Sequence, residues 1–175
     1  ARARFLRRIV GTQLEFEPRR RRDVDGVVAL ADPLHGGTLK PALDYYFAGD
    51  LPVYASSQIH DPARHDGGAA APLAGIRFCD MPWRLLPLET RRSVDAAWPG
   101  TPASLSIFQA VGVDAWRLHA RLGDPARLAD AETARLSGVT GDLRIGPDGR
   151  VDRDLSWAIM GEAGPVALPR VMGGR

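Results

Sequence analysis

The sequence predicts an α/β fold in which parallel strands form a sheet flanked by helices. Three apolar runs of strand length, at residues 26–31, 51–57 and 74–83, are separated first by a segment with helical periodicity and then by a polar loop. The order strand, helix, strand, loop, strand is typical of a parallel α/β unit. A tail at residues 137–160 alternates apolar and polar residues around a "GPDG" turn, which predicts an antiparallel hairpin near the C-terminus.

The first half of the chain contains two predicted helices. Residues 2–10 carry an apolar stripe opposite arginines, and Gly11 follows as a helix-ending residue. A short strand is expected at 13–17, and the run at 26–31 resembles a strand that is covered on both faces. The second helix is expected within 36–50, with Pro41 in its first turn. Its predicted core stripe comprises Leu39, Leu43, Tyr46 and Phe47.

Two further helices are expected after the third strand, at residues 85–98 and 103–122. The longer one ends at Gly123, before a proline. Trp116 in this helix is expected to serve packing. Apolar residues recur along the longer helix at three- and four-residue steps: Leu105, Phe108, Val111, Ala115, Leu118 and Leu122.

The composition bounds the protein class. The chain has 175 residues, of which 45% are hydrophobic and 25% charged, so it is long enough for one domain or a large piece of one. The formal net charge is only +2, which leaves too weak a field for general nucleic-acid binding. Cys79 is the only cysteine, which excludes a disulfide within the chain and a cysteine-based zinc cluster.

The stretch "HDPARHD" contains His60, Asp61, His65 and Asp66, residue types that can bind a divalent metal ion. The two histidines are five residues apart and Pro62 prevents a regular helix, so a solvated loop is the favoured interpretation and neither a metal nor a cofactor is expected. Asp114 and His119 are also five apart and form no dyad. The chain lacks a nucleophile elbow, a phosphate-binding glycine loop and a zinc-protease helix. We therefore do not expect this chain to be an enzyme.

Four consecutive arginines, Arg19, Arg20, Arg21 and Arg22, precede the first apolar run. A charge run of this kind is usually a solvated face, and these side chains can pair with Asp23 and Asp25. No aromatic residues interleave with the run, as binding of single-stranded nucleic acid would favour. A solvated structural face is therefore favoured over a nucleic-acid site.

Four segments in this order, "LEFEPRRRRDVDGVVALADP", "LKPALDYYFAGDLPVYASS", "LAGIRFCDMPW" and "AVGVDAWRL", resemble the LppC/LpoA lipoproteins, activators of class A penicillin-binding proteins. The similarity covers roughly residues 5–160. It departs from the family at Gly26 and Val27, where bulkier residues are common, and in the loop at 60–72.

The resemblance implies a periplasmic-binding-protein type I fold in the carboxy-terminal region of a lipoprotein. It also implies that the four arginines at 19–22 belong to the start of a core strand and to docking of a protein partner. Such a protein is anchored by an upstream lipid on the periplasmic face of the outer membrane, and it binds and activates a peptidoglycan synthase without catalysis. Residues 1–175 then form mostly one lobe of a bilobed domain, and residues 81–122 cross to the other lobe. The chain is expected to be a fragment, whose long helix has lost its covering strands and either folds back onto the remaining lobe or self-associates.

The alternative function is a periplasmic receptor for an amino acid or a peptidoglycan fragment. Ligands of open parallel sheets bind beyond the carboxyl ends of the strands. This rule makes Asp32, Ser56 and Ser57 the candidate cleft residues. Asp32 followed by Pro33 argues against the receptor, because it supplies a negative charge and one fewer amide to a ligand carboxylate. A hydrolase using the loop from His60 to Asp66 is a third, weaker alternative.

Overall fold

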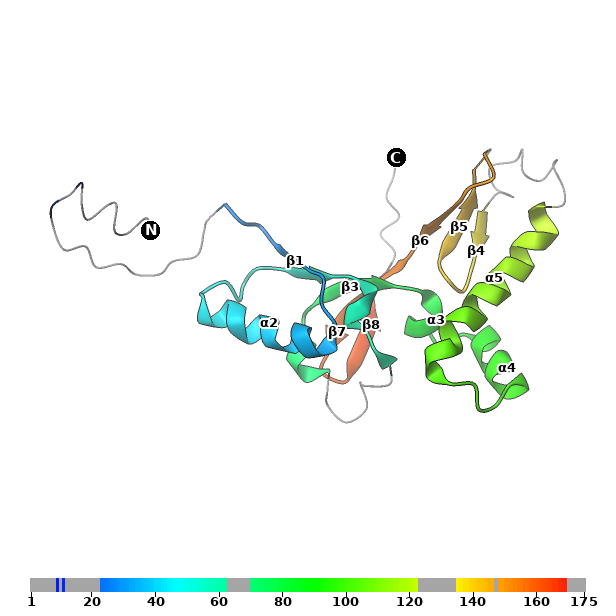
Figure 1. Ribbon diagram of the computed structural model, residues 1–175, viewed down its shortest axis with the longest axis horizontal. Coiled ribbons are helices and arrows are strands. Elements are labelled where there is room, and N and C mark those ends of the chain that lie inside the picture. The colour runs from blue at the N-terminus through cyan, green and yellow to red at the C-terminus, as the bar shows by residue number, and fades with distance from the viewer. Residues whose placement is uncertain are drawn as a thin grey trace.

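The computed structural model describes residues 9, 11, 23–62, 70–122, 135–146 and 148–169. Within them, two sheets lie in different parts of the molecule (Figure 1). The larger sheet has the strand order β1-β2-β3-β7-β8 and the smaller one β4-β5-β6. The larger sheet consists of Val27–Ala29, Val53–Ala55, Arg77–Asp80, Ser156–Gly161 and Gly164–Ala167; the smaller one consists of Arg135–Ser137, Asp142–Ile145 and Val151–Asp154.

The parallel sheet and the antiparallel hairpin are both confirmed. Strands β1, β2 and β3 pair in parallel, while β5 and β6 form the hairpin around the "GPDG" turn. The alternating tail nevertheless divides between the two sheets, because β7 leaves the hairpin and pairs antiparallel with β3. Ala158 and Met160 of β7 point into the core beside β3, and burying them favours this pairing.

Helix α2, Pro33–Tyr45, begins three residues before the predicted segment. Asp32 caps it and Pro33 occupies its first turn, where a missing amide costs little. Pro41 therefore lies inside the helix and not in its first turn, contrary to the prediction. The pair Asp32-Pro33 is a helix-start signal that the sequence analysis interpreted as the end of a strand.

The main hydrophobic core lies between α2 and one face of the larger sheet. Leu39 and Leu43 of α2 pack against it as predicted, whereas Tyr46 and Phe47 follow the helix and are exposed. The fully buried members include Val53, Ile59, Leu73, Ile76, Phe78, Ala158 and Met160.

The opposite face of the larger sheet is open among the described residues. Val28 and Tyr54 are paired neighbours on this face, 78% and 37% exposed, and Trp157 and Val166 continue it across β7 and β8. The prediction that the run at 26–31 is covered on both faces is therefore wrong for this chain. Tyr54 and Trp157 contact each other edge to face, with ring centroids 6.1 Å apart.

A second, smaller core lies among three helices and the turn after β4. Helices α3, Pro82–Leu85, α4, Glu89–Ala97, and α5, Ser106–Leu122, surround Trp83, which is fully buried against Ala110 and Val139. The side chain of Trp83 donates to the Ser106 hydroxyl at 2.7 Å, and its backbone N–H donates to the Val139 carbonyl. Trp83 was expected in the third strand and instead begins a new helical region.

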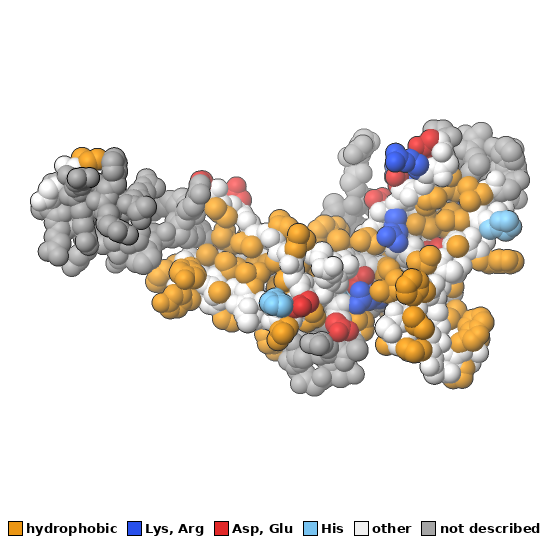
Figure 2. Space-filling view, viewed as in Figure 1, with side chains coloured by type: hydrophobic (Ala, Val, Ile, Leu, Met, Phe, Trp, Pro, Cys, Tyr) orange, Lys and Arg blue, Asp and Glu red, His pale blue; other side chains and the backbone are white. Residues whose placement is uncertain are grey.

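The predicted long helix is confirmed, but the face of it that we expect to be buried is exposed. Phe108 is 69% exposed, and Leu105, Val111 and Leu122 are each at least 44% exposed. The helix packs through Ala110 and Asp114, on another side. It therefore does not fold back to cover its stripe, and hydrophobic side chains gather visibly over α2, α4 and α5 (Figure 2). The expected packing role of Trp116 is also wrong, because it is 77% exposed.

The predicted helix at 2–10, the strand at 13–17 and the arginines at 19–22 lie outside the described residues, apart from two positions of the first segment. Ile9 is helical, and Gly11 has a φ of 67°, the conformation of a helix-ending glycine.

Candidate functional site

The carboxyl ends of the three parallel strands meet at one edge of the larger sheet, because β1, β2 and β3 run in the same direction. Asp32 follows β1, Ser56 and Ser57 follow β2, and Asp80 ends β3. The fold thus places the predicted cleft residues along one edge, where open α/β sheets bind ligands. A ligand there remains a prediction.

The side chain of Asp32 caps the start of helix α2. Its carboxylate accepts a hydrogen bond from the His35 backbone N–H at 2.9 Å and lies 2.8 Å from Nδ1 of the same residue. The backbone hydrogen bond first, and then the imidazole contact, hold the pKa of Asp32 below its ordinary value of 3.8. Capping an exposed helix end explains this residue without a ligand.

Ser56 is the exception at this edge. Its Oγ is buried and has no hydrogen-bond partner among the described residues. A buried hydroxyl without a hydrogen-bond partner is energetically unfavourable. A group that forms a hydrogen bond with it would therefore be bound favourably. Ser57 begins the short 3-10 helix Ser57–Ile59, and its side chain is only partly exposed.

Behind this edge lies a buried charged network that the sequence analysis missed. The Asp80 carboxylate lies 2.8 Å from His60 Nδ1 and 3.1 Å from the Arg84 guanidinium, and it also accepts from the Met81 N–H. Arg84 in turn donates to the His60 carbonyl. His60 is only 3% exposed, so its assignment to a solvated loop was wrong. Pairing and hydrogen bonding make such burial tolerable.

A second buried carboxylate joins α5 to the smaller sheet. Asp114, 3% exposed, accepts from the backbone N–H groups of Val139 and Thr140, at 3.0 and 2.7 Å, and from the Thr140 hydroxyl at 2.7 Å. Gly138 leaves room for this carboxylate, because a Cβ there would lie 2.5 Å from Asp114 Oδ2. This contact joins two segments that are 25 residues apart, and the sequence did not predict it.

The buried and capping carboxylates stabilise the fold. Asp32, Asp80 and Asp114 each satisfy backbone donors or neighbouring side chains. The described parts of the chain contain no group of three or more residues able to hold a metal ion, while His65 and Asp66 lie outside them. None of the described helices is long and apolar enough to cross a membrane.

Comparison with known proteins identifies related sequences. A family model described as "LppC putative lipoprotein" matches residues 1–162. The penicillin-binding protein activator LpoA of Aliivibrio fischeri is 29% identical over 168 residues, which cover 93% of this chain and 26% of that protein. The chain therefore spans about a quarter of the length of the curated relatives it matches.

Solved structures support the same fold. The C-domain of LpoA from Haemophilus influenzae, described as a regulator of PBP1A, superposes with a TM-score of 0.69 and 22% identity, over 95% of this chain and 49% of that one. A putative branched-chain amino acid ABC transporter from Chromobacterium violaceum gives 0.58 and 31% identity, over 90% and 52%. The expected periplasmic-binding-protein-like architecture is thereby confirmed.

Proposed function

Because the chain belongs to the LppC putative lipoprotein family, we propose that it is part of a non-enzymatic regulator that binds and activates a class A penicillin-binding protein in peptidoglycan synthesis. The observation that carries this function is the family match over residues 1–162, in a chain whose curated relatives are named penicillin-binding protein activators. The regulator acts on the periplasmic face of the outer membrane, anchored by a lipid upstream of these residues.

A role without catalysis agrees with how the chain uses its reactive groups. Asp80 is paired with His60 and Arg84, and the resulting network is buried. Asp114 is saturated by backbone donors and a hydroxyl. Neither carboxylate is free to exchange protons with a substrate, as a general acid or base must.

The domain arrangement that we propose is bilobed. The larger sheet and α2 belong to one lobe, and residues 81–122 reach toward the other. The exposed stripe on α5, with Phe108 69% and Val111 45% exposed, supports this arrangement, since apolar stripes on helices normally pack against another layer. The rest of the longer protein supplies that layer.

The test is reconstitution with purified components. The complete lipid-free regulator should bind a class A penicillin-binding protein from the same organism and raise its rate of glycan polymerisation or cross-linking. The regulator alone should release no product from the synthase's substrate. Absence of both binding and stimulation, with a synthase that is active by itself, would contradict the proposal.

Arg19, Arg20, Arg21 and Arg22 are proposed to contribute to docking, because four consecutive arginines suit an acidic protein surface. Replacing all four by alanine should weaken binding to the synthase and make the residual binding less sensitive to salt. The matched control replaces Arg92 and Arg150, whose side chains are 69% and 86% exposed, and should leave the affinity unchanged. Equal losses in both variants would exclude a specific role for the row.

A receptor function is the second candidate, and the unpartnered Ser56 Oγ favours it. An amino acid or muropeptide at 100 times its dissociation constant should stabilise the protein by about 2.7 kcal/mol. The Ser56→Ala variant should lose that stabilisation. If no ligand shifts the melting temperature of the complete protein, the edge of the sheet serves the fold alone.

A further inference from the structure

The smaller sheet presents a charged face on which like charges lie directly opposite each other at two places. Arg135 of β4 lies directly opposite Arg144 of β5, and Asp142 of β5 lies directly opposite Asp154 of β6. Directly opposed residues share a face, with Cβ atoms about 5 Å apart, and like charges in such positions repel. The arginine pair, on β4 and β5, and the aspartate pair, on β5 and β6, therefore lie two residues apart along β5, the strand that they share.

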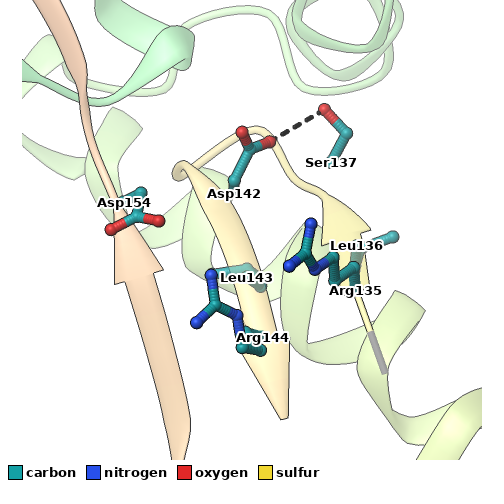
Figure 3. A pocket seen from close by; sticks show the side chains of 7 residues that line it. All are labelled: Arg135, Leu136, Ser137, Asp142, Leu143, Arg144 and Asp154. Atoms are coloured by element: carbon teal, nitrogen blue, oxygen red, sulfur yellow. Dashed lines mark hydrogen bonds between the residues drawn. The ribbon is translucent and has the colours of Figure 1, made fainter. Parts of the chain in front are cut away.

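These groups surround a hollow of about 260 Å³ (Figure 3). Both arginine side chains extend over the face of the sheet, and the carboxylates of Asp142 and Asp154 lie toward its other end (Figure 3). The lining residues are Arg135, Leu136, Ser137, Asp142, Leu143, Arg144 and Asp154. The hollow is smaller than the roughly 300–1,000 Å³ of pockets for drug-sized ligands, so it suits a small molecule or a peptide end.

The two guanidinium groups have no ion pair or hydrogen bond in the described part of the chain. Arg121 donates to the backbone carbonyl of Arg135 and not to its side chain. Asp152 is opposite Arg144 on β6, yet the two side chains form no ion pair within those residues. Asp142 is oriented by the Ser137 hydroxyl, which donates to it at 3.1 Å. The arginines are thus available to an anion.

We propose that this face of the smaller sheet binds a small amphoteric molecule, an amino acid or diamino acid, through a carboxylate on Arg135 and Arg144 and an ammonium group on Asp142 and Asp154. Arginine matches a carboxylate with two parallel N–H donors, which makes this contact specific as well as strong. The ammonium group is attracted by both carboxylates. Side chains two residues apart on a strand are separated by roughly 6.8 Å. The carboxylate and the ammonium group of one such ligand can therefore reach the arginines and the aspartates at the same time.

The site is distinct from the edge of the larger sheet and does not depend on the synthase as partner. Ser56 lies at the end of β2, in the other sheet. Binding at the two places can therefore be separated by substitution.

Titration calorimetry of the 175-residue chain with diaminopimelic acid tests the site. Pimelic acid, which keeps the carboxylates, and cadaverine, which keeps the amines, are the matched probes. Diaminopimelic acid should bind more tightly than either. Each of Arg135→Gln and Arg144→Gln should weaken it roughly tenfold, the loss of one charged hydrogen bond, and Asp154→Asn should reduce its advantage over pimelic acid.

The control is Arg153→Gln, because Arg153 is opposite Leu143 and thus on the other face of the same sheet. It should bind as the unsubstituted chain does, and so should Ser56→Ala. No binding of diaminopimelic acid, or equal binding by Arg144→Gln and the unsubstituted chain, would overturn the site. Equal affinity for pimelic acid would overturn the role of the aspartates. Circular dichroism of each variant verifies that the exposed substitutions leave the fold intact.

Discussion

Asp114 is the residue on which the smaller core depends. A single carboxylate satisfies two backbone N–H groups and a hydroxyl in the turn after β4, across 25 or 26 residues of sequence. Those donors are buried together with the carboxylate, so water cannot replace it as their hydrogen-bond acceptor when it is removed.

We expect Asp114→Ala to lower the free energy of unfolding by about 3 kcal/mol, because leaving a buried donor unsatisfied costs 1–3 kcal/mol. Asp114→Asn keeps one acceptor oxygen and should cost less. Urea denaturation followed by circular dichroism measures both. The control Asp95→Ala removes a carboxylate that is 53% exposed and should change little. A loss no larger for Asp114→Ala than for the control would contradict this role.

The start of helix α2 carries a pH-dependent contribution to stability. The hydrogen bonds from His35 to the carboxylate lower the pKa of Asp32 in the folded state. A group whose pKa is lowered by folding stabilises the protein above its ordinary pKa, and this stability is lost as the pH falls through the folded value. Asparagine also caps helices well, so Asp32→Asn removes mainly the charge.

The melting temperature of the unsubstituted chain should therefore exceed that of Asp32→Asn near neutral pH. The difference should shrink as the pH falls below the ordinary carboxyl value of 3.8. Thermal melts of both proteins across this range measure it. A difference that stays constant with pH would mean that the charge of Asp32 does not contribute.

Helix α5 has two faces that differ in what covers them. One packs through Ala110 and Asp114, and the other leaves Phe108, Val111 and Leu122 exposed. Isolated soluble chains rarely keep so apolar a stripe uncovered. When the rest of the longer protein is absent, a second copy of the same helix is the available apolar partner.

Light scattering should accordingly find the chain alone in concentration-dependent dimers, and Phe108→Glu should return it to a monomer. The free energy of unfolding of that monomer should change by no more than about 0.5 kcal/mol, because the side chain is exposed within one copy. Trp116→Glu is the matched control: Trp116 is equally exposed but lies off the stripe, so the dimer should persist. A chain that is monomeric at its highest soluble concentration would contradict this expectation.

On the scale of the whole molecule, the two hydrophobic clusters have no buried residue in common. Phe78 belongs to the cluster at the larger sheet, and Trp83 belongs to the cluster among α3, α4 and α5. The larger sheet and helices α4 and α5, which carry residues of these clusters, lie in different parts of the described structure (Figure 1). Separate clusters of this kind can open as separate cooperative units.

Hydrogen exchange should reveal the two units. Trp83→Ala should raise exchange in α5 and in residues 138–141 while β1, β2 and β3 stay protected, and Phe78→Ala should do the reverse. Each substitution removes a fully buried aromatic side chain, which typically costs about 3–5 kcal/mol. If either variant raised exchange uniformly along the chain, the molecule would unfold as a single unit.

The sequence by itself determined which elements exist. Local periodicity and turn residues were enough for β1, β2, β3, the long helix and the hairpin, because each pattern is complete within one segment. The resemblance to the LppC family was likewise readable from four short segments. Helix boundaries were less secure, as the start of α2 at Pro33 illustrates.

Only the tertiary structure decided which faces are buried and which residues meet. Helix α5 has apolar residues on more than one side, and the side that packs was selected by donors on the distant turn at Val139 and Thr140. His60 looked solvated because its partner, Asp80, is 20 residues away. The pairing of β7 with β3 and the opposition of Arg135 and Arg144 are also contacts between separate segments. Periodicity records only how side chains repeat along one element, whereas burial and charge pairing depend on which other elements lie against it.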